Sequence, residues 1–255
     1  MSDESTLRAM FKGVFGAVLV VILVTPFAWV LDDRRPAFAE EVPAEEIIRR
    51  VDEIRNPAEA YFMKVAVVNE GAPSDRSVFE VSVRGNSRTL VKTVEPPRDR
   101  GRNLLMVDEQ MWAYIPNIKR AVRVSLSQKL TGQAANGDIS RMRWSGDYAS
   151  TVERRDTNEW VLLLTAKKQG LTYEKVRVWV EKSTYRPLRA EFLTPAGKPL
   201  KIAAYSGYIP LAGKIRPSEI RIRDAVRENE SSTVKILSME ERAFPESIFN
   251  QNSLK

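Results

Sequence analysis

Residues 173–181 read Tyr173-Glu-Lys-Val-Arg-Val-Trp-Val-Glu181, and every second residue from Val176 to Val180 is a valine. Successive side chains of a β-strand point to opposite faces, so this period of two predicts a strand with one apolar face. The same alternation recurs in residues 79–84 through Phe79, Val81 and Val83, and in residues 119–124 through Val122 and Val124. Three separate segments are therefore expected to bury one side each.

Further strand-like runs follow one another at short intervals, separated by turn signals such as Arg84-Gly-Asn and Pro195-Ala-Gly-Lys. They cover residues 61–68, 88–94, 103–107, 111–115, 160–166, 188–193, 200–205, 218–223 and 233–239. Short strands with frequent turns are typical of an antiparallel meander, and the one-sided alternation predicts a single sheet with one apolar face. Such a face requires a cover.

The clearest helix is predicted for residues 43–55. Ile47, Ile48, Val51 and Ile54 recur at helical spacing and would form one apolar stripe. Glu45 and Glu46 in the first turn and Arg55 in the last agree with the helix dipole, and Asn56-Pro57 ends the helix. We expect this helix to lie over the apolar face of the sheet.

A second part of the cover is predicted from residues 127–144, a long interruption between strands. It contains Leu130, Ile139, Met142 and Trp144 among polar residues and two glycines. Loops of this length inside a compact domain are usually functional or disordered. We therefore expect a mobile cover here, and one last short amphipathic turn formed by residues 244–249 and Leu254.

The composition argues against catalysis. The 255 residues include no Cys and no His, which excludes disulfides, thiolate zinc sites, cysteine nucleophiles and Ser-His-Asp triads. Ser232 and Lys235 have the S-x-x-K spacing of some serine acyltransferases, but on a strand that spacing places them on opposite faces. Asp138 and Asp147 could pair or bind calcium, although cap or turn roles fit such residues better. We expect no enzyme activity, no metal and no cofactor.

The N-terminus has the pattern of a secretory signal. Arg8 and Lys12 precede the uncharged residues 13–31, and Ala37-Phe-Ala39 follows as a small-x-small cleavage box. We expect residues 1–39 to be a signal peptide, with an uncleaved membrane anchor as the alternative. Residues 40–255 would then form one exported domain. The net charge of +7 would otherwise suggest nucleic acid, but that partner is not expected outside the cytoplasm.

A covered sheet with one apolar face and no catalytic residues suits a carrier of amphiphiles. Exposing a lipid chain to water costs about 0.8 kcal/mol for each methylene, so a long chain costs on the order of 10 kcal/mol. A carrier must therefore enclose the chain in an apolar site beneath something that opens.

Several segments resemble the outer-membrane lipoprotein-sorting (LolA-like) family. They are Ile48-Arg-Arg-Val-Asp-Glu-Ile-Arg-Asn-Pro57, Val94-Glu-Pro-Pro-Arg-Asp-Arg-Gly-Arg-Asn-Leu-Leu-Met106, Met111-Trp-Ala-Tyr-Ile-Pro-Asn-Ile-Lys-Arg-Ala-Val-Arg-Val124, the stretch from Ser125 through Asn136-Gly-Asp138 to Asp147-Tyr148, and Pro187-Leu-Arg-Ala-Glu-Phe192. The resemblance spans nearly all of residues 40–255. It implies an unclosed antiparallel β-barrel (a half-barrel) with helices lying in its concave apolar mouth, and no catalytic motif.

The resemblance also implies a periplasmic role in moving lipoproteins or other lipids from the inner to the outer membrane. An inner-membrane permease or exporter and an outer-membrane acceptor would be the partners. Two alternatives remain open, a cargo-free adaptor for an envelope exporter and a carboxylate-based hydrolase. For the carrier, the residues expected to line the lipid cavity are Ile47, Val51, Ile54, Phe79, Val81, Val83, Leu104, Met106, Val122, Val124, Val176 and Val178.

Overall fold

The computed structural model describes residues 41–57, 59–70, 75–227 and 229–254. Residues Val42–Lys255 form one compact unit. The predicted signal segment, residues 1–39, lies outside the described residues. Within the described ranges, no helix combines the length and the apolar character that crossing a membrane requires.

The unit is mostly strand, as the sequence predicts, and its elements follow the chain in this order. They are α1 (Ala44–Arg55), β1 (Ala60–Asn69), β2 (Arg76–Arg84), β3 (Arg88–Glu95), η1 (Pro97–Asp99), β4 (Leu104–Val107), β5 (Gln110–Ile115), η2 (Pro116–Ile118), β6 (Arg120–Val124), β7 (Lys129–Thr131), β8 (Ala134–Ala135), α2 (Asn136–Ser140), β9 (Tyr148–Arg155), β10 (Glu159–Ala166), β11 (Lys175–Glu181), β12 (Pro187–Leu193), β13 (Pro199–Leu211), β14 (Lys214–Asp224), β15 (Ser231–Glu241), η3 (Glu246–Ile248) and η4 (Gln251–Leu254).

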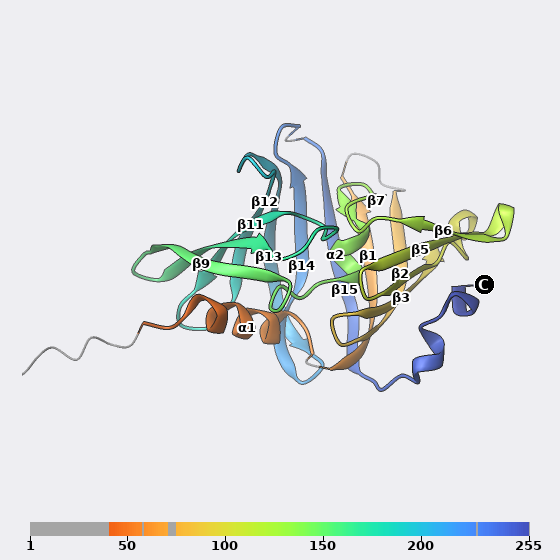
Figure 1. Cartoon of the computed structure of the whole chain (residues 1–255), viewed down its shortest axis with the longest axis horizontal. Helices are drawn as coiled ribbons and strands as arrows, with labels where there is room; N and C mark the ends of the chain where they lie inside the picture. Colours follow the sequence, from red (N-terminus) through yellow and green to blue (C-terminus); the bar gives the residue numbers. More distant parts are fainter. Residues whose placement is uncertain (1–40, 58, 71–74, 228, 255) are drawn as a thin grey trace, which may run out of the picture. The chain divides into compact units, whose positions relative to one another are not determined.

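Thirteen strands form one antiparallel sheet in the order β6-β5-β4-β3-β2-β1-β15-β14-β13-β12-β11-β10-β9. The chain runs from β1 in the middle to β6 at one edge, and then re-enters at the opposite edge through β9 (Figure 1). It returns strand by strand to β15, which pairs with β1. The expected unclosed antiparallel half-barrel is confirmed, because β6 and β9 are not paired with each other.

This topology explains the long interruption seen in the sequence. Residues 125–147, which we call the cover segment, must connect the two edges of the sheet, and they carry β7, β8 and α2. Their apolar side chains, among them Ile139, Met142 and Trp144, are buried in the same core cluster as the inner face of the sheet. The segment is therefore part of the cover, as predicted.

Helix α1 is the other part of the cover and lies alongside β9 and β14 (Figure 1). Ile47, Ile48 and Val51 are fully buried, but Ile54 is only half-buried. The expected apolar stripe is wrong at that position, because Asp52 and Arg55 take the buried places instead. The end of the helix is held by Arg216 of β14, whose Nη1 donates to the carbonyl oxygens of Glu53 (2.7 Å) and Ile54 (3.1 Å). These carbonyls have no partner within the helix, so the guanidinium satisfies them.

One part of the sheet is apolar on both faces, which the sequence did not predict. Leu90 of β3 and Leu105 of β4 point to the outer face, where Phe249 and Leu254 cover them in a second, small core cluster. The side-chain amide of Asn103 donates to the carbonyl oxygen of Leu254 at 3.1 Å. The C-terminal residues thus form a short apolar cover on the outside of β3–β5.

Candidate ligand cavity and its cover

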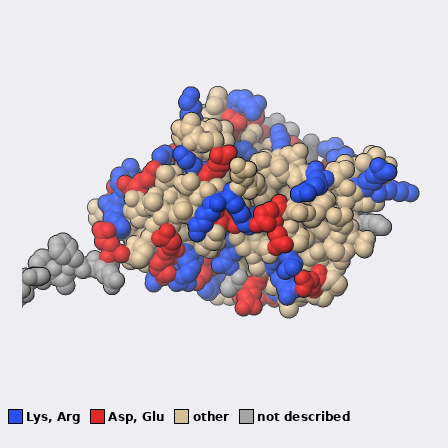
Figure 2. Space-filling view, in the orientation of Figure 1, with Lys and Arg blue, Asp and Glu red and all other residues tan. Residues whose placement is uncertain are grey.

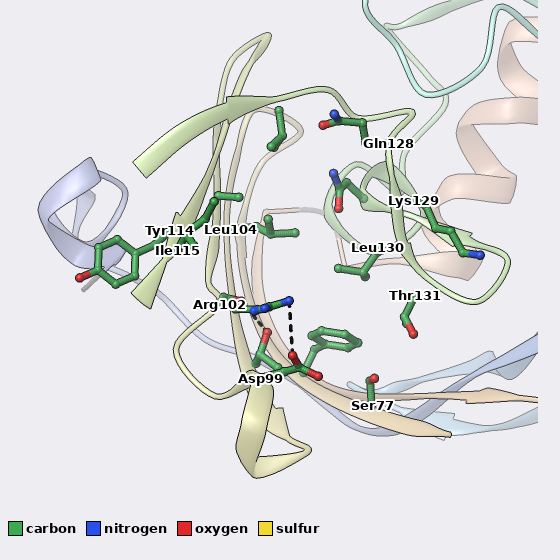
Figure 3. Close-up of a pocket in the computed structure, with 15 residues that line it drawn as sticks. Ser77, Asp99, Arg102, Leu104, Tyr114, Ile115, Gln128, Lys129, Leu130 and Thr131 are labelled. Atoms are coloured by element: carbon green, nitrogen blue, oxygen red, sulfur yellow. Dashed lines mark hydrogen bonds and ion pairs between the residues drawn. The ribbon is translucent and has the colours of Figure 1, made fainter. Parts of the chain in front are cut away.

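A cavity of about 520 Å³ lies between the strands β2–β6 and the cover segment (Figure 3). Its apolar walls come from both sides. The sheet contributes Phe79, Leu104, Ala113, Ile115 and Val124, and the cover segment contributes Leu130. Figure 3 shows Leu104 and Leu130 approaching from opposite walls, whereas the ring of Tyr114 points away toward the outer face. The volume is in the range of sites that bind small organic ligands, about 300–1,000 Å³.

The cavity reaches the surface at the loop between β3 and β4. Asp99 and Arg102 line this end, their ion pair measures 3.4 Å, and the Arg102 side chain is 59% exposed. Thr93 fixes the loop from inside, because its hydroxyl donates to the carbonyl oxygen of Arg102 and its backbone N–H donates to the Asn103 side chain (3.2 Å). Polar side chains also line the cavity, and they are Ser77, Thr93, Gln128, Lys129, Thr131 and Asn136. Walls that combine apolar and polar groups suit an amphiphile.

The cover segment is held at Gln133 by specific hydrogen bonds to the sheet. The hydroxyl of Ser232 accepts from the backbone N–H of Gln133 (2.8 Å) and donates to Oδ1 of Asn69 (2.6 Å). Nζ of Lys201 donates to the carbonyl oxygen of Gln133 at 2.6 Å. Gly132 has φ +52°, and a β-carbon there would lie 1.7 Å from Asn69 Oδ1. The glycine therefore serves close packing of the cover against β1 and β15.

Ser232 and Lys235 do not form a catalytic pair. Ser232 is buried and bonded to Asn69 and Gln133, while Lys235 forms an ion pair with Glu219 on β14 at 3.1 Å. Their spacing along the strand thus gives the two side chains different partners, as the sequence predicts.

Asp138 stabilises the start of α2. Its carboxylate accepts from the backbone N–H of Ala135 (2.8 Å) and from the hydroxyl of Tyr173 (3.1 Å). Burial raises the pKa of Asp138, and the nearby charge of Lys201 opposes that shift only in part. The favoured cap role therefore fits this carboxylate.

Asp147 is the last residue of the cover segment and holds its C-terminal end in place. Nε and Nη2 of Arg141 donate to its two carboxylate oxygens at 2.6 and 2.8 Å, and the Asn86 side chain donates at 3.0 Å. Although burial alone would raise the pKa of Asp147, its hydrogen bonds with Arg141 and the charge of that residue hold it below the usual value. Asp138 and Asp147 have separate partners, and the described residues contain no cluster of carboxylates that could hold a metal ion.

Asp52 links helix α1 to the cover segment, which sequence reasoning missed. Its carboxylate accepts from the backbone N–H groups of Trp144 (2.8 Å) and Ser145 (2.6 Å) and lies 3.4 Å from Nη1 of Arg55. The guanidinium of Arg55 stacks 3.8 Å from the centre of the Trp144 ring. Burial raises the pKa of Asp52 despite the charge of Arg55. The sequence did contain a signal for this role, because Asp52 and Arg55 follow Ile48 at i+4 and i+7 and therefore share its face of the helix.

The twelve residues expected to line a lipid cavity fall into three groups. Phe79, Leu104 and Val124 line the cavity. Val122 and Ile54 are half-buried outside it. The remaining seven are buried in the packed core, and they are Ile47, Val51, Val81, Val83, Met106, Val176 and Val178. Sequence reasoning did not select Ala113, Ile115 or Leu130 as cavity residues, because residues 111–115 are apolar throughout and do not show which side chains face inward, and Leu130 was assigned to the cover.

An unclosed antiparallel half-barrel that is covered across its mouth and encloses a cavity defines a class of covered β half-barrel proteins. A protein family described only as an uncharacterized protein matches residues 85–255. No curated protein sequence matches the chain. Among solved structures, a LolA superfamily protein from Nitrosomonas europaea is 34% identical with a TM-score of 0.78, and the match covers 84% of this chain and 100% of that one.

Two further structures share the fold at lower identity. A domain assigned to the outer membrane lipoprotein-sorting proteins, from Vibrio parahaemolyticus, has 20% identity and a TM-score of 0.68, with 83% of this chain and 97% of that one covered. A DUF1329 family protein from Desulfovibrio piger has 18% identity and a TM-score of 0.69, with 83% and 98% covered. The chain belongs to the LolA superfamily.

Proposed function

We propose that this protein is a lipid carrier of the cell envelope, which encloses an acyl chain of a lipoprotein or another lipid in the cavity between β2–β6 and the cover segment. The observation that supports this most is the cavity itself, because it combines about 520 Å³ of space with a mainly apolar sheet wall, a mostly polar cover wall and a charged opening. Phe79, Leu104 and Val124 would contact the chain from the sheet, and Leu130 from the cover.

The energetics favour such a ligand. Transfer of an acyl chain from water into an apolar site gains about 0.8 kcal/mol for each methylene. A site of this volume accommodates a ligand of moderate size, so we expect one chain rather than several to be enclosed. Residues 42–255 suffice for the test, since they form a compact unit with its own core. The Nitrosomonas relative, matched along its whole length to 84% of this chain, folds in the same way.

The test is extraction of lipids from the purified unit, followed by mass spectrometry. We expect the wild type to carry lipid and Ala113→Trp to lose it, because the indole would fill the cavity. Ala204→Trp is the matched control, since Ala204 is exposed on β13 and the same bulk there leaves the cavity free to hold lipid. Equal lipid loads in the two variants would overturn the proposed site, and a wild type without lipid would overturn the carrier.

The proposal includes a periplasmic location, with residues 1–39 removed as a signal peptide. N-terminal sequencing of envelope-extracted protein should then begin at Glu40, whereas retention of Met1 would identify the anchored form. The partners would be an inner-membrane permease or exporter and an outer-membrane acceptor. Cargo-free protein that co-purifies with a permease would instead support the adaptor function.

A further inference from the structure

The two loops at the opening of the cavity form a single surface, which we call the basic rim and define as residues 96–102 and 116–120. The first loop joins β3 to β4 and the second joins β5 to β6. They touch, because a β-carbon on Gly101 would lie 3.4 Å from Cγ of Pro116. The backbone N–H of Tyr114 also donates to the carbonyl oxygen of Asn103 at 2.8 Å. The exposed side chains of the two loops therefore face the same binding partner.

The basic rim is strongly cationic. Five cations and one carboxylate, Asp99, give it a net charge of +4, and the cations are Arg98, Arg100, Arg102, Lys119 and Arg120. All five are exposed. Asp99 is shared between Arg98 (3.6 Å) and Arg102 (3.4 Å), so one carboxylate offsets only a small part of this charge. Figure 2 shows Lys and Arg side chains gathered at the end of the sheet where Figure 1 places β5 and β6.

The rim also presents an apolar side chain at its tip. Ile118 is 55% exposed, and Lys119 and Arg120 follow it directly. Lys119 has φ 50°, in the left-handed region where Gly or Asn is usual. Lys119 thus places a positive charge at a position where Gly or Asn would adopt the backbone conformation with less strain. An apolar tip flanked by long cationic side chains suits a membrane interface, where the tip enters the headgroup layer and the charges meet phosphates.

A second exposed apolar tip offers a comparison within the molecule. The turn between β13 and β14 presents Ile209 and Ile215, but Lys214 is the only cation of residues 209–215. That tip has apolar surface without a concentration of charge, and its residues do not line the cavity. Of these two surfaces, only the basic rim combines exposed cations and an exposed Ile with the opening of the cavity.

We propose that the basic rim docks the opening of the cavity onto an anionic phospholipid surface. The function proposed above explains why the opening should face a membrane, since the chain of a lipid would then pass directly between bilayer and cavity. The docking itself depends on the rim charges and Ile118, and not on the presence of cargo. Each well-placed cation near an anionic bilayer is worth about a fivefold change in partitioning, and salt screens the attraction.

The test is co-sedimentation of the unit formed by residues 42–255 with vesicles of phosphatidylcholine, alone or mixed with phosphatidylglycerol. We expect binding to the mixed vesicles only, weakening as salt is added. Lys119→Glu combined with Arg120→Glu should lower the apparent affinity at least about 25-fold, because two attractions become repulsions. Ile118→Ser should weaken binding severalfold without changing its salt dependence. Lys198→Glu combined with Lys214→Glu is the matched control, because it reverses the charge of two exposed lysines outside the rim. This control should bind as the wild type does.

Three results would overturn the docking proposal. They are a wild type that does not bind the mixed vesicles, an equal loss in rim and control variants, and a rim variant that binds fully. A wild type that ignores vesicles but binds polyglutamate belongs to the first of these results and would assign the rim to an acidic protein partner. Lipid mass spectrometry on the same variants separates the two proposals. A unit without lipid that still binds vesicles through the rim contradicts the carrier alone, and a lipid-loaded unit that ignores vesicles contradicts the docking alone.

Discussion

The two halves of the sheet are covered in different ways and are packed differently as a result. Beneath α1 the core is solid, and Ile47, Val51 and Val178 are fully buried. Beneath residues 128–131 and Asn136 of the cover segment, the strands β2–β6 keep a cavity of about 520 Å³. Both halves present apolar side chains on the inner face, so the strands alone do not determine where space remains.

The difference lies in the side chains that the two covers supply. Helix α1 inserts Ile47, Ile48 and Val51, which are fully buried against the strands in the main core cluster. Over the cavity the cover segment supplies mostly polar side chains, with Leu130 as the one large aliphatic residue among those that line it, and the segment is held by hydrogen bonds at Gln133 and Asp147. A cover attached by polar contacts around its perimeter does not need to fill the space beneath it. Four predictions test this contrast.

The largest effect is expected from a charge in the packed half. Val178→Glu should lower the free energy of unfolding by more than about 4 kcal/mol, because an unpaired carboxylate would be buried. Val124→Glu, at the cavity wall, should cost less than about 2 kcal/mol, since water can hydrate the carboxylate there. Urea denaturation of both variants measures the difference. Similar losses in the two would remove the distinction between the halves.

The link between the two covers should have the next largest effect. Asp52→Ala removes the acceptor of two backbone N–H groups and the partner of the buried Arg55. The expected loss is about 3–5 kcal/mol, as for other buried pairs that lose one partner. Glu53→Ala, one residue further along α1, breaks only an exposed ion pair with Arg49 and should cost less than about 1 kcal/mol. Denaturation curves that coincide for the two variants would show that Asp52 does not link the covers.

Asp147 should contribute a smaller, pH-dependent amount. Its pKa is held below the usual value by Arg141, so its stabilisation is complete above the unfolded pKa of about 3.9 and is lost as pH falls through the folded value. Asp147→Asn keeps the shape of the side chain but removes the charge on the hydrogen bonds with Arg141, so it should cost about 2 kcal/mol at pH 7, and the gap to the wild type should narrow below about pH 4. Thermal unfolding across this pH range measures the gap. A gap that is constant with pH would contradict the assigned ionic role.

The smallest effect is expected in local opening. Amides of residues 127–132 should exchange with solvent faster than those of β11, because the former lie over a cavity and the latter lie within the sheet. Residues 133–145, which are held by Ser232, Lys201 and Asp52, should be intermediate. Hydrogen exchange with mass spectrometry resolves these segments. Equal protection in 127–132 and β11 would show that the cover segment is not mobile.

Local sequence patterns predicted most of the fold. Strict alternation identified β2, β6 and β11, and helical spacing identified α1. Strand β9 was missed because it is an edge strand, exposed over most of its length, and its sequence Tyr148-Ala-Ser-Thr-Val-Glu-Arg-Arg155 has few apolar residues. The apolar outer face at Leu90 and Leu105 was missed because its cover comes from the distant C-terminus.

The position of the cavity was less predictable. Alternation identifies residues that face the inner side of the sheet, and Val81, Val124 and Val178 all satisfy that criterion. Whether such a residue meets packed side chains or open space depends on the cover above it, which is set by contacts between distant parts of the chain. The role of Asp52 was hidden for the same reason, since its partners Trp144 and Ser145 lie more than ninety residues away.

The central claim is that lipid occupies the cavity under the cover segment and not the core under α1. The most direct measurement is photo-crosslinking of residues 42–255 with a fatty acid that carries a diazirine near the end of its chain, followed by peptide mass spectrometry. We predict that the label attaches to the walls of the cavity, at residues such as Phe79, Val124 and Leu130. Label found instead on Ile47, Val51 or Val178 would contradict the account.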